Sequence, residues 1–510
     1  MTLLQGILSA RIVLLVLLGS IFLWLVAGRP VSRRLRIVIF GVLVGALLSY
    51  PNFGVFHPDH SGYRAGHIHY VDAFHYFMGA KYLPELGYSR LYEAVVVAGR
   101  ELGAFGDVTH VRDLTSYTLR QASSLDAQAI RGRFSKERWL RFKRDLVFFG
   151  PRIEVWRELL VDRGYNDPPP RALLLHLLVR WLPANTFTLT LLTSLDYVAV
   201  VSGFFFVWRA FGEIPTALAL AFFSLSFFAR FDWVGGSLLR WYWIAALLIG
   251  VASFARGFSR TAGIMLGYAV LARIFPIFFL VPLGIKWLQS RDAVLARCLR
   301  SAVGGVLVVA LGLVAVGDER SFLSEFLSKI HVHGTDPFIN SVGLGSVMVF
   351  GAAPWSANPD GRVYVTEAAI VGARPAPYVL PLVSAVYLLV ALPLILRARP
   401  LESVMYAVPL IFCAVSPTGY YYSFLVLLVL LPWQRGGRVD RIGLIEMALL
   451  TFILAASYAF ELASGEFFPL FYQVSIQLGV FFLFWLGFEY VRLGYVNHRV
   501  AAPRRPPPGG

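Results

Sequence analysis

Long apolar runs constrain this chain more than any other feature. We count about 13 of them, and a helix needs roughly 20 mostly apolar residues to cross a bilayer. Only helices and closed barrels satisfy their backbone hydrogen bonds in lipid, so we expect an all-α integral membrane protein. The runs lie near 12–28, 36–51, 186–208, 215–230, 240–255, 261–272, 275–288, 301–316, 378–396, 402–415, 419–433, 442–462 and 470–492.

The composition excludes other classes of protein. Hydrophobic residues make up 57% of the 510 residues and charged residues only 15%, whereas soluble domains carry about 25% charged residues. A soluble enzyme, a disordered chain and a disulfide scaffold are therefore excluded, and Cys298 and Cys413 fit no disulfide framework or metal motif. The net charge of +16 comes from residues that set the orientation in the membrane rather than from a nucleic-acid-binding surface, because Arg and Lys gather at the ends of the apolar runs.

The positions of the basic loops predict an orientation. If the short arginine-rich loops are cytoplasmic, the amino terminus lies outside and the carboxyl terminus inside. The 41 Arg against five Lys favour a bacterial source, so we expect the protein in the inner (plasma) membrane. With the orientation given above, the candidate site faces the exterior. The expected parts are two first spans (1–51), a large outer segment with the candidate motif (52–185), membrane helices (186–316), a second outer segment (317–377), C-terminal membrane helices (378–495) and a disordered cytoplasmic tail (496–510).

Two local features of these parts leave alternatives open. The short runs 261–272 and 275–288 form either one helix kinked at Pro276 or a broken pair. In the outer segment, 126–163 has apolar residues at helical spacing among many charges. That pattern predicts amphipathic helices, which lie on the outer leaflet or pack against the bundle.

The densest polar chemistry follows the second span. Between residues 57 and 94 the chain holds five of its ten histidines together with several carboxylates. The pattern over 68–82 predicts a helix, on which Asp72, His75, Tyr76 and Gly79 share one face. A carboxylate, an imidazole and a phenol would then point together just outside the membrane.

Three interpretations of this cluster compete. In the first, Asp72 is a general base that accepts a hydroxyl proton, with Asp59 as its rival for that role. His75 and Tyr76 would then orient Asp72 or the sugar. In the second, the histidines bind a divalent metal, although no ligand spacing such as HExxH is present. In the third, the segment is a hydrogen-bonded polar loop at the membrane interface. No cofactor is certain, and the cluster only leaves room for a metal ion.

The order of motifs resembles a known family. Asp72, Tyr76 and Gly79 follow a D-x-x-x-Y-x-x-G order, a Leu-Tyr pair ends at Tyr92, and YNDPPP at 165–170 opens an apolar segment. This order resembles the GT-C superfamily of polytopic glycosyltransferases, nearest the mannosyltransferase group called glycosyltransferase family 87. The chain departs from the pattern in an extra first span and in the roughly 75 residues between Tyr92 and the Pro-Pro element.

The resemblance implies a GT-C-like helical bundle with a large outer loop. It implies a polyprenyl-phosphate sugar as donor, a glycan or lipid as acceptor, and Asp72 as the base, usually with inversion at the anomeric carbon. A lipid phosphate needs cations near the outer face, and the candidates are Arg273, Arg240, His331 and His333. The candidate substrate-binding residues are Lys81, Tyr92, Asp167, Tyr420 and Tyr421.

Two other functions remain open. A transporter or flippase for a lipid-linked saccharide or small solute would place several charges at mid-membrane depth, and Asp196 within 186–208 is a candidate proton-path residue. A non-catalytic membrane subunit would tolerate substitution of Asp72 and Arg273 but not changes in 126–163. No Walker A motif or suitable GxGxxG pattern indicates a nucleotide-driven mechanism.

Overall fold

The computed structural model describes residues 2–28, 31–57, 64–162, 164–165, 167–315, 325–329, 337–357, 363–433, 439–465 and 467–501. About 76% of the chain is helical and there is little sheet, which confirms an all-α membrane protein. Within these residues, six helices are long and apolar enough to cross a membrane, or seven if one bent pair forms a single span. The predicted number of about 13 spans is therefore not confirmed, because several apolar runs form helices too short or too bent to cross alone.

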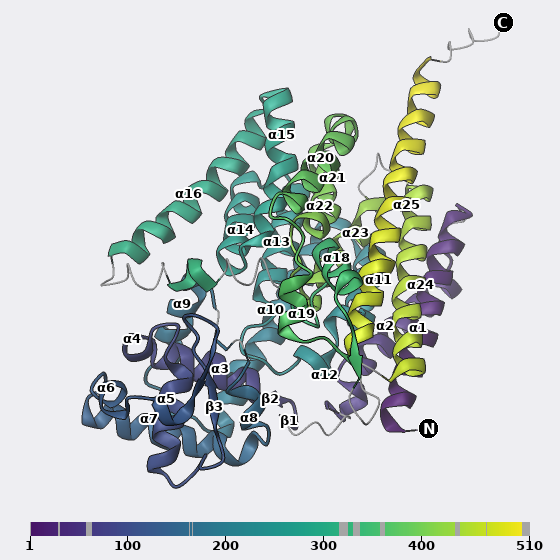
Figure 1. Cartoon of the computed structure of the whole chain (residues 1–510). Helices are drawn as coiled ribbons and strands as arrows, with labels where there is room; N and C mark the ends of the chain where they lie inside the picture. The colour runs from purple at the N-terminus through teal and green to yellow at the C-terminus, as the bar shows by residue number, and fades with distance from the viewer. Residues whose placement is uncertain are drawn as a thin grey trace, which may run out of the picture.

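The six long helices form the frame of the bundle. Helix α1 packs along α24, which also contacts α25, and the three lie side by side on one flank (Figure 1). The helices are α1 (Leu3–Val26), α10 (Thr186–Phe211), α16 (Ala293–Ala315), α20 (Val379–Arg397), α24 (Arg441–Ser464) and α25 (Phe467–Ala501). Because α25 continues to Ala501, the tail predicted over 496–510 begins as helix, and 502–510 lie outside the described residues.

Shorter helices fill the space between the long ones. They include α2 (Arg33–Ser49), α11 (Glu213–Leu225), α12 (Phe231–Val234), α13 (Tyr242–Ala255), α14 (Ser259–Ala272), α15 (Leu280–Ser290), α22 (Ala407–Ala414) and α23 (Val426–Leu430), with the 3-10 helices η5 (Phe275–Phe279) and η7 (Gly419–Leu425). The apolar stretches 261–272 and 275–288 are a broken pair. The break comes at Arg273, whose backbone is extended (φ −154°, ψ 115°), before Pro276 begins the 3-10 turn.

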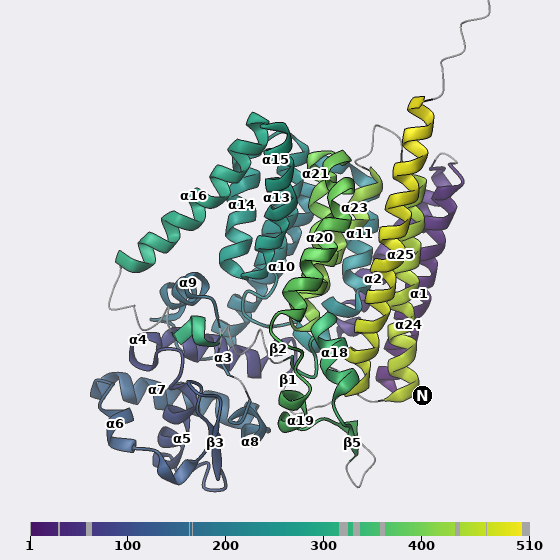
Figure 2. The ribbon, with the colours of Figure 1, turned by 45° about the horizontal axis from the view of Figure 1, so that its top comes forward.

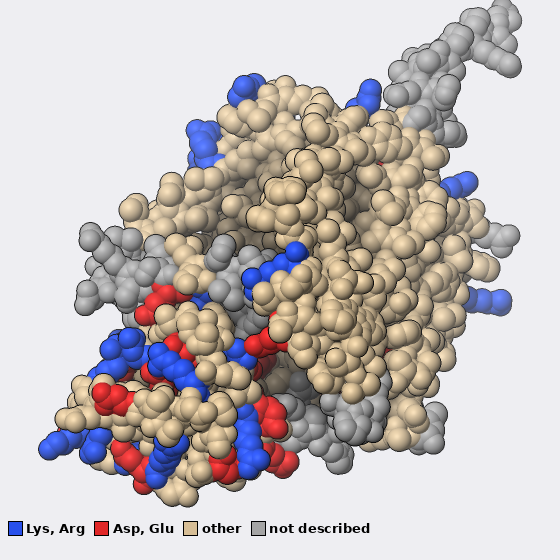
Figure 3. Space-filling view, viewed as in Figure 1, with Lys and Arg blue, Asp and Glu red and all other residues tan. Residues whose placement is uncertain are grey.

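The described part of residues 52–185, the segment predicted to lie outside the membrane and called the outer segment below, folds beside one end of the bundle. Figures 1 and 2 show its helices grouped there, at the same end as the amino terminus and opposite the carboxyl-terminal end of α25. Its main elements are α3 (Tyr70–Lys81), α4 (Leu83–Leu86), α5 (Leu91–Glu101), β3 (His110–Arg112), β4 (Leu119–Gln121), α6 (Ala127–Arg131), α7 (Lys136–Phe149), α8 (Trp156–Leu159) and α9 (Pro169–Val179). Strands β3 and β4 form an antiparallel hairpin. Charged side chains of both signs gather on this segment, whereas the visible flank of the bundle is almost free of them (Figure 3).

The apolar stripe predicted over 126–163 packs inside the outer segment. Helix α7 buries Trp139, Phe142 and Phe149, and the Phe149 ring meets Phe74 of α3 edge-on at 5.6 Å between centroids. The helix contacts α3 and α5. The amphipathic helix is thus present, and its apolar face covers α3, the helix that carries the candidate base, rather than the bundle.

A short hairpin joins α3 to the bundle. Strands β1 (Arg64–Ala65) and β2 (Ile68–His69) pair antiparallel, and the His69 backbone N–H donates to the Gly236 carbonyl at 2.9 Å. Gly236 has φ +71°, and a Cβ there would lie 1.6 Å from the His67 carbonyl oxygen. Only glycine fits such a contact, so the hairpin and the loop between α12 and α13 are held against each other.

Candidate functional site

Asp72 lies at the start of α3, where the structure joins it to the membrane helices. His69 caps the helix by accepting the Asp72 backbone N–H at its Nδ1, and a carboxylate in the first turn is favoured by the helix dipole. The Asp72 carboxylate forms an ion pair with Arg240 and accepts a hydrogen bond from the Ser237 hydroxyl at 2.7 Å. Its side chain is 20% exposed, so the carboxylate is both held in place and reachable.

Asp196 of α10 fixes the backbone that carries Arg240. Its two carboxylate oxygens accept the backbone N–H groups of Arg240 at 2.7 Å and Trp241 at 2.8 Å. These N–H groups precede α13 and have no acceptor within that helix, as is usual at helix starts. Asp196 therefore acts as a buried cap. Its carboxylate contacts the backbone of Arg240 and not its guanidinium.

Arg240 is enclosed by aromatic rings. Its guanidinium carbon lies 4.5 Å from the Tyr420 ring centroid and 5.4 Å from that of Tyr76. Aromatic faces attract a guanidinium. Arg240 thus bridges the outer segment, through Asp72 and Tyr76, and η7 of the bundle, through Tyr420. Its Nε atom is buried without a hydrogen-bond partner.

A second cationic cluster lies beside the first. Asp167, fully buried, pairs with Arg171 on α9 and accepts from Arg273 Nη1 at 3.3 Å. Arg171 also lies 4.3 Å from the Tyr76 ring centroid, on the same ring that Arg240 faces. The Nε and Nη2 atoms of Arg273 are buried without a hydrogen-bond partner. Because buried donors are nearly always satisfied, these two N–H groups mark a place for an acceptor.

An apolar pocket opens next to Arg273. Its volume is about 350 Å³, within the range of small-molecule sites. Its walls come from η5, from the segment that leads into η7, from Pro168, and from Phe338 and Ser341. They are mostly apolar, and the polar side chains among them are Arg273, Ser341, Ser416, Thr418, Tyr420 and Tyr421. Tyr421 packs on Trp243 and Phe275. The pocket therefore has a wall that suits a hydrocarbon chain, and the Arg273 guanidinium is part of its lining.

Three candidates from the outer segment serve other contacts. His75 shares a 2.7 Å hydrogen bond with the Tyr92 hydroxyl, which itself donates to Asp162. Burial lowers the pKa of His75, and Asp162 opposes that shift. Lys81 pairs with Asp145 at 2.6 Å and donates to the Leu182 carbonyl. The expected orientation of Asp72 by His75 is thus not seen, and these residues stabilise the outer segment.

Several sequence candidates lie outside the described residues. They are Asp59, His331 and His333, so the rivalry between Asp59 and Asp72 stays open. In the part of the chain that the structure describes, no group of three or more His, Cys, Asp or Glu residues is arranged to hold a metal ion.

Two site residues were missed by sequence reasoning. Ser237, which donates to Asp72, lies in the GGSLLR stretch before Arg240, and a serine in a glycine-rich turn carries no distinctive signal. Arg171 follows Asp167 by four residues, a spacing at which opposite charges meet on a helix. That spacing was visible in the sequence.

The fold and the site define a helical membrane protein with a carboxylate–arginine pair where the outer segment meets the bundle. No protein-family model matches the chain, and no curated protein or solved structure matches it either.

Proposed function

We propose that this chain is a membrane glycosyltransferase of GT-C type. It would move a sugar, mannose or another hexose or pentose, from a polyprenyl phosphate to an envelope glycan or lipid on the outer face of the bacterial inner membrane. The observation that carries the proposal is the partly exposed Asp72, held by Arg240, whose guanidinium lies against Tyr420 of a mostly apolar pocket. Arg273 lines the same pocket, and its Nε and Nη2 atoms have no hydrogen-bond partner.

Each part has a chemical role in the proposal. The Asp72 carboxylate takes the proton of an acceptor hydroxyl, and that oxygen forms a bond to the anomeric carbon of the sugar. The bond between the anomeric carbon and the phosphate oxygen breaks, and its electron pair leaves with the polyprenyl phosphate. Arg273 receives this charge through its two free N–H groups, and the isoprenoid chain occupies the apolar pocket. Stabilising a developing charge is often the largest contribution to catalysis.

Arg240 links the base to the donor site in this proposal. In the structure it contacts both Asp72 and Tyr420, and Tyr420 lines the donor pocket. A carboxylate paired with an arginine is a weak base. When a donor phosphate enters, Arg240 is drawn toward it and Asp72 becomes free to accept a proton. The base would thus be active only when the donor is bound.

Sugar transfer from a labelled polyprenyl-phosphate donor pool tests the proposal. Membranes that contain wild type, Asp72→Asn or Asp107→Asn at matched expression are compared. Asp107 is an outer-segment carboxylate that pairs with Arg157 on the surface, so its variant controls for the charge change. We expect transfer in wild type and Asp107→Asn, and none above background in Asp72→Asn.

One observation favours a second candidate, a transporter or flippase. Arg11 lies within α1, is 1% exposed, and pairs with Asp232 at 3.4 Å. Asp232 also pairs with Arg230, which reaches Glu461 of α24. Charges within membrane helices often belong to transport pathways. A substrate-dependent flux in liposomes, lost in Arg11→Gln, would favour this function over sugar transfer.

A further inference from the structure

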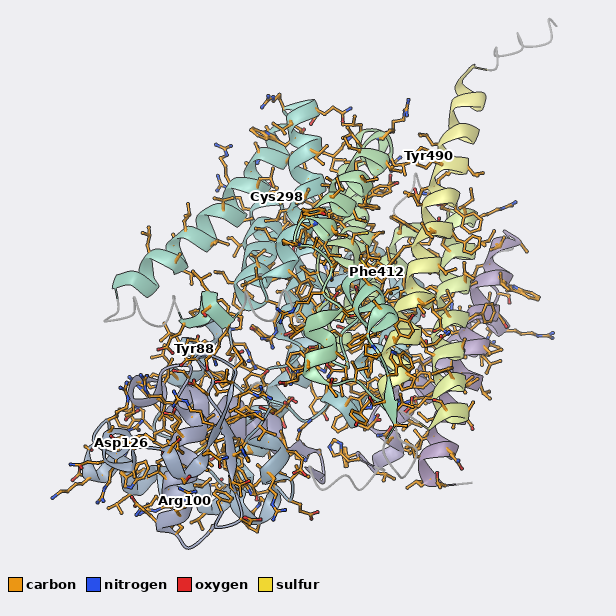
Figure 4. All side chains as sticks on the ribbon, viewed as in Figure 1. Tyr88, Arg100, Asp126, Cys298, Phe412 and Tyr490 are labelled. Atoms are coloured by element: carbon orange, nitrogen blue, oxygen red, sulfur yellow. The ribbon has the colours of Figure 1, made fainter. Side chains whose placement is uncertain are left out.

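A separate pocket lies on the outer segment, away from the membrane helices. It has a volume of about 340 Å³ and is formed by the start of α5, by β4 and by α6 with the residues after it. Figure 4 places Asp126, one of its lining residues, at the edge of the outer segment far from the bundle. It is therefore distinct from the site around Asp72, which lies where the outer segment meets the bundle.

Three arginines line this pocket, and they differ in how they are neutralised. Arg120 pairs with Asp113 at 2.6 Å and with Glu93 at 3.3 Å. The Nε atom of Arg133 donates to the Glu85 carbonyl, and among the described residues no carboxylate lies within 4 Å of its guanidinium, so that Glu325 and Glu93 act on it only from farther away. The Arg90 guanidinium has neither an ion-pair partner nor a hydrogen-bond acceptor among the residues that the structure describes. Two of the three cations thus lack a direct counter-charge.

The unneutralised arginines repel one another. Burial lowers the pKa of the Arg133 guanidinium, and the neighbouring Arg90 lowers it further. Glu325 and Glu93 act in the opposite direction, but both carboxylates already have other partners. An oxyanion between Arg90 and Arg133 would remove this repulsion, and guanidinium groups bind phosphate and carboxylate through paired hydrogen bonds.

The remaining polar groups of the lining define the ligand further. Glu93 pairs with Arg120 through Oε1, and Asp126 accepts the Ala129 N–H at Oδ1, so each carboxylate has a second oxygen that can accept a hydrogen bond. Ser124 supplies a hydroxyl. A bare phosphate needs only donors, whereas a sugar also presents hydroxyl groups that seek acceptors. We propose that this pocket binds an acidic saccharide, whose phosphate or carboxylate group lies between Arg90 and Arg133 and whose hydroxyl groups meet Glu93 and Asp126.

This site indicates which class of acceptor the proposed transferase uses. An acidic envelope glycan bound here would be anchored on the outer segment while another of its residues reaches Asp72. That role rests on the proposed function, whereas the binding of an acidic saccharide does not. The test therefore measures binding directly.

Isothermal titration calorimetry of the full chain in detergent measures binding at this pocket. The probes are glucose 6-phosphate, glucuronic acid, glucose and inorganic phosphate. The variant is Arg90→Gln combined with Arg133→Gln, and the control is Arg131→Gln with Arg144→Gln, which removes the same charge at residues that do not line the pocket. Thermal unfolding confirms that each protein is folded.

We expect at least one acidic sugar to bind more tightly than both glucose and inorganic phosphate. Two lost charge-assisted contacts, at about 1.5 kcal/mol or more each, weaken binding by at least roughly a hundredfold in the pocket variant, while the control variant and Asp72→Asn bind as wild type does. Equal binding by the pocket variant overturns the site, as does an acidic sugar that binds no better than glucose. Inorganic phosphate that binds as tightly as glucose 6-phosphate overturns the assignment to a saccharide. If Asp72→Asn keeps sugar transfer but the pocket variant loses binding of the acidic sugar, the proposed role of Asp72 as base is wrong and the saccharide site is supported.

Discussion

Arg240 forms an ion pair with Asp72 although 168 positions separate them in the chain. The pair connects the outer segment to the membrane helices, and a further hydrogen bond holds the backbone of each partner. The backbone of Arg240 is held by Asp196, and that of Asp72 by His69. The position of the candidate base thus depends on three elements, α3, α10 and the start of α13.

Asp196 is predicted to position Arg240. Asp196→Leu removes both acceptors for the N–H groups before α13, at a cost of about 1–3 kcal/mol for each buried donor left unpaired, and Asp196→Asn keeps one acceptor. We expect thermal stability in detergent and sugar transfer to fall in the order wild type, Asn, Leu. Tyr197→Phe, at the half-exposed next residue, is the control. Equal effects of Asn and Leu would contradict a capping role.

Arg273→Gln is predicted to weaken donor binding. The proposed phosphate contacts use the two N–H groups that lack a partner in the structure. Hydrogen bonds to charged groups contribute about 1.5–3 kcal/mol each, so the loss of both contacts should raise KM for the donor by about a hundredfold or more. Arg260→Gln, in the first turn of helix α14, which ends just before Arg273, should leave KM unchanged. A donor KM that is insensitive to Arg273 would remove it from the donor site.

Gly236→Ala is predicted to separate the hairpin from the bundle loop. A methyl group there meets the His67 carbonyl oxygen at 1.6 Å and the residue has φ +71°, so the chain must move. Strain of this kind costs about 1–3 kcal/mol or more. We expect a lower unfolding temperature and faster proteolysis of the outer segment. Gly54→Ala, with φ +88° and no atom nearby, separates backbone strain from the steric clash, and equal effects of the two changes would contradict the contact.

Lys329 gives a prediction for pH. Its ammonium group donates to the carbonyls of Tyr88 and Tyr165 at 2.6 Å each. Burial lowers its pKa to about 7, while Glu325 and Asp162 oppose the shift. The unfolded lysine keeps its ordinary pKa near 10.4, so between these values the unfolded state binds more protons and stability rises with pH.

Hydrogen exchange at 325–329, corrected for its intrinsic pH dependence, measures this effect. We expect protection to increase from pH 7 to pH 10 in wild type and to stay level in Lys329→Met, because methionine has no proton to lose. Lys136→Met, on exposed surface, should behave as wild type. A slope that persists in Lys329→Met would assign the pH dependence to another group.

Much of the local structure could be predicted from the sequence. Helical spacing predicts a helix over 68–82, and α3 covers Tyr70–Lys81. Arg240 and Arg273 were selected because cations at span ends suit a lipid phosphate, and the structure places both beside Tyr420 or Tyr421. Periodicity and charge act over a few residues, so a single sequence contains them.

The number of spans and the partners of each side chain could not be predicted in the same way. Hydropathy does not distinguish a helix that crosses the bilayer from a short helix buried among others, and the 14 residues of α13 are an example. On α3, His75 and Asp72 share a predicted face, yet His75 turns to Tyr92 and Asp72 to Arg240. These choices depend on packing between distant segments, which a pattern on one helix does not contain.

The most direct test of the account is single-turnover transfer by purified protein with the labelled donor already bound. Asp72→Asn removes the proposed proton acceptor but keeps the shape of the side chain. We predict that it binds the donor within about threefold of wild type, a difference below 1 kcal/mol, and transfers the sugar about 10²–10⁴ times more slowly, the usual contribution of a general base. Transfer by Asp72→Asn at the wild-type rate would contradict the assignment of Asp72 as the base.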